Sequence, residues 1–388
     1  MGKDIWLESI NIKGFRPFRD FTAKFGPLEV IVGANGSGKT ALFEFLRFLR
    51  DGMRSDIPLA MLPGAEEQRI FHVGGESKLS WDIGIAFRSQ GIKSPIHYQG
   101  QLSGPVGFVR PISEHVQSDD TAYLAMNEVE GQLEGAVNEP GQSEQHIKLG
   151  RRNQLALSTM TNTTMKTAYT IQEYIRDWQF YSGFRINSDA IKHYTDIEHA
   201  PRLKEDAGNL GAVLHYLITE HSAAFNELQQ FLRQTVPNFK ELMVGQRDFR
   251  AEVMALWNED GIDRSLTLAD LSDGTLRLLC WGALCVHPNP PTLICLDEPD
   301  QGIHPRTLPI LEGFLQKASQ RTQILIATHS SYFLTQFDLS QIAVMRKEKG
   351  EAQFIKPSDS KTLTGILADF GPAEIEALHR SDELERLP

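Results

Sequence analysis

Cysteine is scarce in this chain of 388 residues. The three that occur, Cys280, Cys285 and Cys295, make neither a CxxC pair nor a Cys/His set with metal-binding spacing. We therefore expect buried thiols in a reducing compartment.

Long apolar runs are also missing. No run approaches the roughly 20 residues that a membrane-spanning helix needs, and polar residues stand at positions 1–4, where a secretory signal would place its apolar core. With 41% hydrophobic and 23% charged residues, the composition is that of an ordinary globular protein. These features predict a cytoplasmic protein with no membrane partner.

An excess of positive charge is absent too. The chain has 39 Lys and Arg against 50 Asp and Glu, a net charge of −11 with His neutral. Between Pro111 and Leu149, Lys148 stands against eight acidic residues: Glu114, Asp119, Asp120, Glu128, Glu130, Glu134, Glu139 and Glu144. The composition argues against a surface coated with nucleic-acid-binding charge, although the nearly balanced remainder leaves room for a local basic groove.

Apolar periodicity predicts the order of the elements. We expect strands over 5–13, 21–25, 28–32 and 78–87, a helix over 40–50, and one or two helices over 209–236. A strand pair is expected at 241–244 and 249–257, followed by helix 276–286, strand 292–296, helix 308–319 and strand 324–328. This last alternation is typical of a parallel α/β core. The polar stretch 111–162 lacks sustained periodicity, and we interpret it as a surface insertion or flexible excursion with short helices.

A glycine-rich loop follows the strand over 28–32. It reads Gly33-Ala34-Asn35-Gly36-Ser37-Gly38-Lys39-Thr40, a complete GxxxxGK[ST] motif with a helix behind it. Backbone N–H groups of such a loop surround a β-phosphate, the lysine reaches the β and γ oxygens, and the Thr40 hydroxyl ligates Mg²⁺. The residues expected to bind nucleotide are Gly33, Asn35, Gly36, Ser37, Gly38, Lys39 and Thr40. The strand, loop and helix context argues against the alternative, a chance glycine-rich turn.

Two adjacent acids end the apolar strand over 292–296. A strand buried on both faces can carry Asp297 and Glu298 only at its carboxyl end, where α/β sheets place their ligands. We expect Asp297 to hold Mg²⁺ together with Thr40, and Glu298 to polarise the attacking water as general base. An acidic turn after a capped strand is the alternative, and the glycine-rich loop argues against it.

Two weaker signals complete the set. Leu271-Ser272-Asp273-Gly274-Thr275 precedes an apolar helix, and it is either an ordinary helix start or a second phosphate site formed by Ser272 and Gly274. The buried strand over 324–328 ends at His329, which either is a structural histidine or senses a γ-phosphate.

These four elements, in this order, resemble the ATP-binding-cassette ATPases. The segments IKGFRPFRDF, VGANGSGKT, LSDGTLRLL, LDEPDQGIHP and ATHS look like the RecF, SMC and OLD-type branch, and AGNLGAVLHYL and the WQFY segment at 178–181 fit as well. Within that branch, the chain is most similar to stand-alone bacterial ATPases of about this length. The fold implied is a bilobal α/β P-loop ATPase with a mixed sheet core, an antiparallel β lobe and a helical subdomain.

The resemblance implies a division of the chain. Its parts are an N-terminal ATPase lobe (1–110), an acidic variable insertion (111–162), a helical subdomain with connecting strands (163–265), a C-terminal ATPase lobe (266–345) and a tail (346–388).

The resemblance also implies a head-to-tail homodimer. Each ATP, with Mg²⁺, would lie between the glycine-rich loop of one protomer and Ser272 and Gly274 of the other. Arg16 is implied as a further nucleotide contact, and the segment 300–304 as a loop that crosses the dimer interface. The glutamine loop has two candidates, Gln68 and Gln90.

Several features of the branch are missing. No heptad arms are present, and about 60 residues follow His329, too few for the TOPRIM nuclease module of OLD proteins. We therefore expect an ATPase that acts as a switch or scaffold for a partner effector protein, for example in anti-phage defence. The alternative is a RecF/SMC-like ATPase that binds DNA in repair or recombination.

Overall fold

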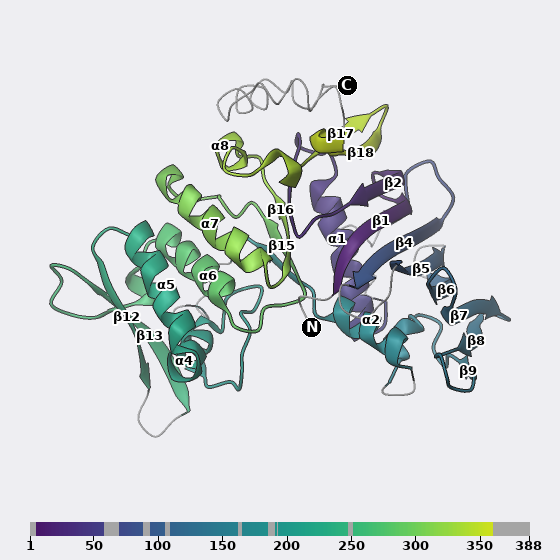
Figure 1. Cartoon of the computed structure of the whole chain (residues 1–388), viewed down its shortest axis with the longest axis horizontal. Coiled ribbons are helices and arrows are strands. Elements are labelled where there is room, and N and C mark those ends of the chain that lie inside the picture. Colours follow the sequence, from purple (N-terminus) through teal and green to yellow (C-terminus); the bar gives the residue numbers. More distant parts are fainter. Residues whose placement is uncertain are drawn as a thin grey trace.

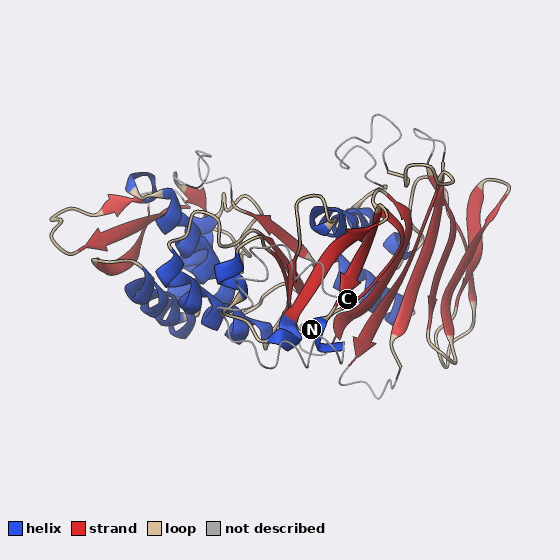
Figure 2. Ribbon diagram, turned by 90° about the horizontal axis from the view of Figure 1, so that it is seen from above, coloured by secondary structure: helices blue, strands red, loops and turns tan. Residues whose placement is uncertain are grey.

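The computed structural model describes residues 5–57, 70–87, 94–104, 109–161, 165–184, 191, 193–246 and 251–359. Two lobes lie on either side of a central sheet (Figure 1). One lobe is built on a large antiparallel sheet, and the other contains most of the helices. Figure 2 shows the antiparallel strands following one another away from the centre of the molecule. The bilobal α/β architecture expected from the sequence is confirmed.

The antiparallel sheet has eight strands in the order β2-β1-β4-β5-β6-β7-β8-β9. Their bounds are β1 Ile5–Phe15, β2 Phe18–Lys24, β4 Lys78–Phe87, β5 Ile96–Ser103, β6 Arg110–Gln117, β7 Ala122–Val129, β8 Gln132–Val137 and β9 Gln145–Lys148. In β4 the alternating residues Leu79, Trp81 and Ile83 are buried while Ser80 and Asp82 are partly exposed. The alternation of the sequence therefore sets which face of this sheet packs on the core.

The interpretation of 111–162 as a surface excursion with short helices was wrong for most of its length. Strands β6 to β9 continue the antiparallel sheet, and of the described residues only 157–159 form a helix, the 3-10 helix η2 (Leu157–Thr159). The hydrophobic alternation is weak because each strand buries few residues, and one of those in β6 is the fully buried Glu114. An acid at a core position conceals the strand period that a hydrophobic pattern is used to detect.

Helix α1 (Lys39–Arg54) joins this lobe to the central sheet. Its apolar side contributes Leu42, Phe45 and Leu49 to the same core as the inner face of the antiparallel sheet. Helix α2 (Lys166–Arg176) packs beside it. The helix that follows the glycine-rich loop is thus held by one continuous core.

The central sheet has six strands in the order β10-β15-β16-β3-β17-β18. Their bounds are β3 Leu28–Val32, β10 Gln179–Ser182, β15 Leu293–Asp297, β16 Gln323–Ala327, β17 Ile342–Glu348 and β18 Glu351–Ile355. All neighbouring pairs are parallel except β17 with β18, so the sheet is mixed, as expected. Leu293 and Cys295 face the core with α1, whereas Ile294 and Leu296 face the helical lobe. Burial on both faces explains the continuous apolar runs of these strands.

The helical lobe packs on the other face of the central sheet. It consists of α4 (Leu210–Glu220), α5 (Ser222–Thr235), α6 (Asp273–Val286) and α7 (Leu308–Ser319), with a small sheet of β11 (Thr195–Asp196), β12 (Phe239–Gln246), β13 (Glu252–Glu259) and β14 (Leu266–Thr267). The helices expected over 209–236, 276–286 and 308–319 and the strand pair around 241–257 are confirmed. Cys280 and Cys285 lie in this core and Cys295 in the other, and all three are buried free thiols, as expected.

The remaining short elements are η3 (Leu268–Asp270), η4 (Pro305–Thr307), α8 (Ser331–Leu334), η5 (Leu339–Gln341) and η6 (Pro357–Asp359). Within the described part of the chain, none of the helices combines the length and the apolar character needed to cross a membrane.

Candidate functional site

Three strands of the central sheet end side by side. The parallel register pairs Asp297 with Ala327 and Ala327 with Ile31. The segments that follow these positions therefore emerge at one edge of the sheet: the glycine-rich loop from β3, Glu298 from β15 and His329 from β16. Because the carboxyl ends of parallel strands are where α/β sheets bind ligands, this edge is the candidate site.

The glycine-rich loop needs glycine for two different reasons. At Gly33 a Cβ atom would lie 2.0 Å from the carbonyl oxygen of Met345 in β17, so the close packing of the loop on that strand excludes a side chain. Gly36 and Gly38 have φ angles of 78° and 117°, a region that other residues rarely adopt. Helix α1 then starts at Lys39 with no side-chain cap and no acidic residue in its first turn. The N-terminal end of the helix is thus left available for an anion.

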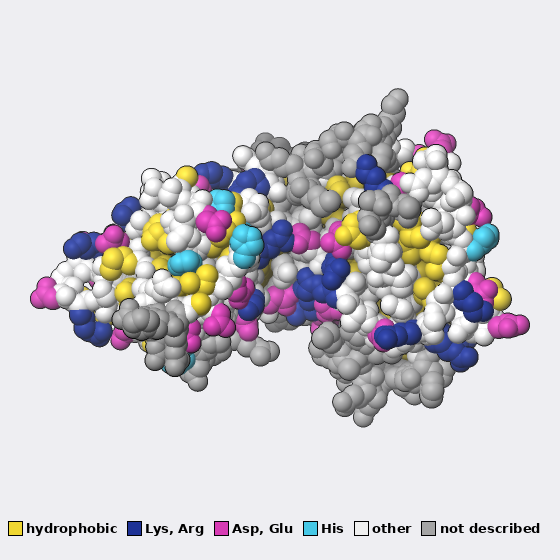
Figure 3. Space-filling view, turned by 90° about the horizontal axis from the view of Figure 1, so that it is seen from below, with side chains coloured by type: hydrophobic (Ala, Val, Ile, Leu, Met, Phe, Trp, Pro, Cys, Tyr) yellow, Lys and Arg dark blue, Asp and Glu magenta, His cyan; other side chains and the backbone are white. Residues whose placement is uncertain are grey.

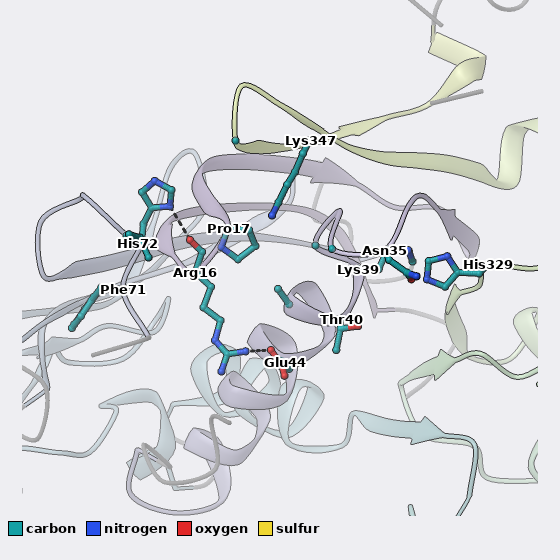
Figure 4. A pocket seen from close by; sticks show the side chains of 15 residues that line it. Arg16, Pro17, Asn35, Lys39, Thr40, Glu44, Phe71, His72, His329 and Lys347 are labelled. Carbon is teal, nitrogen blue, oxygen red and sulfur yellow. Dashed lines mark hydrogen bonds and ion pairs between the residues drawn. The ribbon is translucent and has the colours of Figure 1, made fainter. Parts of the chain in front are cut away.

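A cavity of about 690 Å³ opens at this helix end. It is lined by Arg16, Pro17, Asn35, Gly36, Gly38, Lys39, Thr40, Ala41, Glu44, Phe71, His72, Val73, His329, Lys347 and Gly350. Figure 4 shows Asn35, Lys39 and His329 grouped on one side of it, with Phe71 and His72 on the opposite side. The cavity therefore combines the glycine-rich loop with residues from four other parts of the chain.

The donors at the loop fit a phosphate group. Lys39 Nζ donates to the carbonyl oxygens of Gly33 and Ala34 at 2.5 and 3.2 Å, which keeps the ammonium group within the loop. Ser37 Oγ is buried and has no hydrogen-bond partner among the described residues. An oriented helix end, a buried cation and an unsatisfied hydroxyl are groups of the kind that bind a phosphate chain.

Asp297 stands close enough to the loop to interact with it electrostatically. Burial raises the pKa of Asp297, while the nearby charges of Lys39 and Arg47 act to lower it. Among the described residues no group of three or more His, Cys, Asp or Glu is arranged to hold a metal. Two oxygen ligands, Thr40 and Asp297, suit Mg²⁺ all the same, because this ion usually takes one or two protein ligands together with phosphate oxygens and water.

Glu298 is held in an unusual conformation. Its φ angle is 52°, and its N–H donates to the carbonyl of Ala327 at 2.8 Å. The pKa of Glu298 is raised to about 7, mainly by burial and also by the charges of Asp300 and Asp297, while the hydrogen bond from the His329 N–H acts to lower it. A left-handed glutamate with a perturbed pKa beside a cavity is typical of a functional position.

His329 is the nearest partner of this carboxylate. Its backbone N–H donates to Glu298 Oε2 at 3.2 Å, and its Nε2 lies 3.6 Å from Glu298 Oε1. The His329 side chain is 40% exposed and lines the cavity. The position at the cavity, next to the glutamate, favours a functional role over a structural one.

Arg16 lines the same cavity from the turn between β1 and β2. Its guanidinium forms an ion pair with Glu44 on α1, and its carbonyl oxygen accepts a hydrogen bond from His72 Nδ1 at 2.8 Å. The φ angle of Arg16 is 47°. Arg16 therefore lies at the cavity, where a nucleotide contact would have to be, and beside it lies a carboxylate that the sequence did not indicate.

Ser272 and Gly274 lie elsewhere in the protomer. They do not line the cavity. Ser272 is exposed and caps α6 by accepting from the Thr275 N–H at 3.2 Å, and a Cβ on Gly274 would lie 2.9 Å from the carbonyl oxygen of Gly302. The other predicted residues lie at the same sheet edge, and those that line the cavity are Arg16, Asn35, Gly36, Gly38, Lys39, Thr40 and His329. Gly33, Ser37, Asp297 and Glu298 do not line it, but they lie in the loop or at the strand end next to it.

Lys347, Phe71, His72 and Val73 also line the cavity, and sequence reasoning missed them. Phe71 to Val73 belong to a segment without periodicity, so no local signal marks them. Lys347 follows the apolar run of β17, and a lysine at the end of a strand looks like an ordinary surface residue. The glutamine-loop candidates Gln68 and Gln90 lie outside the described residues.

Comparisons with known proteins agree with this geometry. Residues 141–335 match the family model "AAA domain, putative AbiEii toxin, Type IV TA system", and residues 9–178 match a second AAA domain model. No match was found among curated proteins.

Two solved structures are similar along most of the chain. An SMC head bound to the C-winged helix domain of ScpA aligns with a TM-score of 0.54 at 12% identity, over 90% of this chain and 97% of the other. An SMC head domain with an extended coiled coil, bound to the C-terminal domain of ScpA derived from Pyrococcus furiosus, aligns with a TM-score of 0.55 at 9% identity, over 94% and 100%. These likenesses show the fold. The first family model covers half of the chain, so the protein belongs to the AAA domain family described by that model, and it has the fold of an SMC head ATPase.

Proposed function

We propose that the protein binds ATP with Mg²⁺, hydrolyses it, and uses the cycle as a switch for a partner. One observation carries this proposal. The register of β15, β16 and β3 gathers Asp297, Glu298, His329 and the glycine-rich loop at a single edge of the central sheet.

Each side chain has a distinct task in this proposal. The loop N–H groups and Lys39 bind the phosphate chain, and Thr40 and Asp297 would hold Mg²⁺, which supplies positive charge to the phosphate oxygens. Glu298 accepts a proton from the attacking water as general base, and His329 orients Glu298 and faces the γ-phosphate. The catalytic residues are therefore Glu298 and His329.

A head-to-tail dimer accounts for the position of Ser272 and Gly274. In the protomer these residues lie apart from the cavity, at an accessible helix start. A second protomer that presents its α6 start to the phosphate chain adds the donors that the first protomer lacks there. ATP then bridges the two chains, and hydrolysis releases them.

The closed and open dimers are the two states that a partner can distinguish. An effector protein is the partner that we favour, since the related SMC heads are bound to ScpA and the matching family is described by a toxin–antitoxin function. An anti-phage role belongs to this proposal. Figure 3 shows acidic and basic side chains intermixed over much of the described surface on that face, which favours a protein partner over direct binding of DNA.

The experiment is the mass in solution of Glu298→Gln with and without ATP and Mg²⁺, after purification from cells in which its partners are retained. We expect the mass of Glu298→Gln to double when ATP is added, because a variant that binds ATP without hydrolysing it should stay in the closed dimer. Two controls accompany it: Lys39→Ala, which should not bind ATP, and Ser272→Arg, which should bind ATP but stay monomeric.

An unchanged mass of Glu298→Gln on addition of ATP and Mg²⁺ would contradict the dimer proposal. DNA that copurifies and dissociates steeply with added salt would support the DNA-binding alternative instead. ATP binding by Lys39→Ala equal to that of the unaltered protein would contradict the assignment of the nucleotide site itself.

A further inference from the structure

A short loop, residues 298–304, leads from the end of β15 to η4 and packs on the way against the first turns of α6. It begins at Glu298, and at Asp300 it is bonded to the next strand end, where Thr328 Oγ1 donates to Asp300 Oδ1 at 2.7 Å. Within the loop, the Gln301 N–H donates to the Glu298 carbonyl at 3.1 Å. This end of the loop is therefore tied to the residues that flank the cavity.

The other end of the loop rests on Arg277, one turn into α6. Arg277 Nη1 donates to the carbonyl oxygen of Gln301 at 2.5 Å. Gly302, with a φ angle of 75°, lies under the guanidinium so closely that a Cβ there would be 3.1 Å from Arg277 Nη1. Arg277 Nε is buried and has no hydrogen-bond partner among the described residues. The guanidinium of Arg277 thus donates one hydrogen bond to the loop and packs against the loop backbone at Gly302.

The loop conformation needs such support. Glu298 and Gly302 both adopt positive φ angles, and a non-glycine residue in this region persists only where its surroundings impose it. Burial of the Arg277 Nε atom without a hydrogen-bond partner among the described residues costs free energy, so the contact is not one that general stability would select. Its geometry instead links the loop that carries the general base to the helix that carries Ser272 and Gly274.

We infer that Arg277 is a positioning residue that holds the loop 298–304 against α6 and thereby fixes Glu298 for hydrolysis. The inference rests on the proposed ATPase function. It also has a consequence for the dimer: when the α6 start contacts the nucleotide of the other protomer, a shift of α6 changes the position of the loop that begins at Glu298, through Arg277 and through the packing of Gly274 on the Gly302 carbonyl.

The test compares Arg277→Ala and Arg277→Lys with Arg306→Ala, a matched control on an exposed arginine just beyond the loop. We expect Arg277→Ala to lower kcat about 10- to 100-fold while KM for ATP changes less than about 2-fold, because misplacing a reacting group by about 1 Å has effects of up to this size. Arg277→Lys, which can still donate to the Gln301 carbonyl, should restore a large part of kcat. Arg306→Ala should match the unaltered protein.

Amide hydrogen exchange of the peptide 298–304 is measured on the same proteins. Exchange should be faster in Arg277→Ala than in Arg306→Ala, with the rest of the chain unchanged.

Normal kcat or unchanged exchange in Arg277→Ala would overturn the inference, as would equal effects of Arg277→Ala and Arg306→Ala. If the unaltered protein hydrolyses no ATP, the proposed function fails, and hydrogen exchange still decides whether Arg277 holds the loop. If Arg277→Ala does not fold, Arg277→Lys and Arg277→Gln allow the same comparison.

Discussion

Each of the two large sheets contains a glutamate whose pKa is raised to about 7, and the two have opposite surroundings. Glu298, at the edge of the central sheet, is 28% exposed in its side chain, has a positive φ angle and lies beside His329. Glu114, in the antiparallel sheet, is fully buried. It accepts hydrogen bonds from Tyr98 Oη at 2.9 Å and from the N–H groups of Ala156 and Leu157 at 2.5 and 2.8 Å.

A perturbed pKa therefore does not by itself identify a functional acid. Burial raises the pKa of both carboxylates, but Glu114 has its donors supplied by the fold and no access to the cavity. It joins β6 to η2, which packs against α1. Glu298 is partly exposed beside His329, which lines the cavity, as the proposed general base requires, whereas Glu114 connects parts of the lobe.

The largest expected effect is a difference in ATP turnover between variants of the two glutamates. Glu298→Gln should lower ATP turnover roughly 10²- to 10⁴-fold, the usual contribution of a general base, whereas Glu114→Gln should leave turnover per folded molecule within about 2-fold, since it touches no cavity residue. Steady-state phosphate release by both purified variants gives the answer. Equal losses would mean that Glu298 is no more a catalytic group than Glu114.

Substitution of Glu114 should lower the stability of the fold more than substitution of Glu298, the reverse of their order in activity. Glu114→Ala leaves the Tyr98 hydroxyl and two backbone N–H groups buried without an acceptor, so we expect the free energy of unfolding to fall by about 3 to 5 kcal/mol. Glu298→Ala should cost less than about 1 kcal/mol, because its side chain is partly exposed. Urea denaturation followed by circular dichroism measures both. A larger loss for Glu298→Ala would reverse the comparison.

The two carboxylates should also titrate in different profiles. Glu114 has a higher pKa in the folded chain, about 7, than its ordinary value of 4.5. The folded state thus holds the proton more tightly, and this stability, fully present below about pH 4.5, is lost as the pH rises to 7. The loss is roughly 3 kcal/mol, and Glu114→Gln should abolish it.

Ionisation of Glu298 should instead appear in kcat, which should rise about tenfold per pH unit below pH 7 and then level off. A flat kcat profile would exclude Glu298 as the base.

The smallest effect concerns the rim of the cavity. Lys347 lines it from the β17–β18 hairpin, and Figure 4 shows its side chain pointing toward Pro17, whereas Lys349 in the turn of the same hairpin does not line it. Lys347→Ala should weaken ATP binding about tenfold, as expected for one charge-assisted contact to a phosphate, and Lys349→Ala should not. Equilibrium titration with a fluorescent ATP analogue can detect the difference. Equal affinities would leave Lys347 as an ordinary surface residue.

Several elements were predictable because local chemistry determines them. The glycine-rich loop, the strand over 28–32 and the helix over 308–319 follow from residue type and spacing over a few positions, and the structure has the last two with these bounds. The apolar strands that end in Asp297 and His329 were recognisable because a strand buried on both faces accepts polar residues only at its end.

Other features were not predictable, because they depend on residues far apart in the chain. The strands of 111–148 were missed since Glu114 occupies a core position, satisfied by N–H groups more than 40 residues away. Lys347 and His72 reach the cavity only through the pairing of β17 with β3 and the packing of residues 70–72 against the β1–β2 turn.

The sequence alone determined that this chain has a phosphate-binding loop, an acidic strand end and a buried parallel core, because each is a local pattern of residue types. Only the tertiary structure decided that Glu298 has a left-handed backbone beside His329, that Glu114 is internal, and that Arg277 of α6 donates a hydrogen bond to the loop that follows Glu298. Those outcomes depend on strand register and on packing between distant segments. The contacts that stabilise them join residues far apart in the chain, so no short stretch of sequence indicates them.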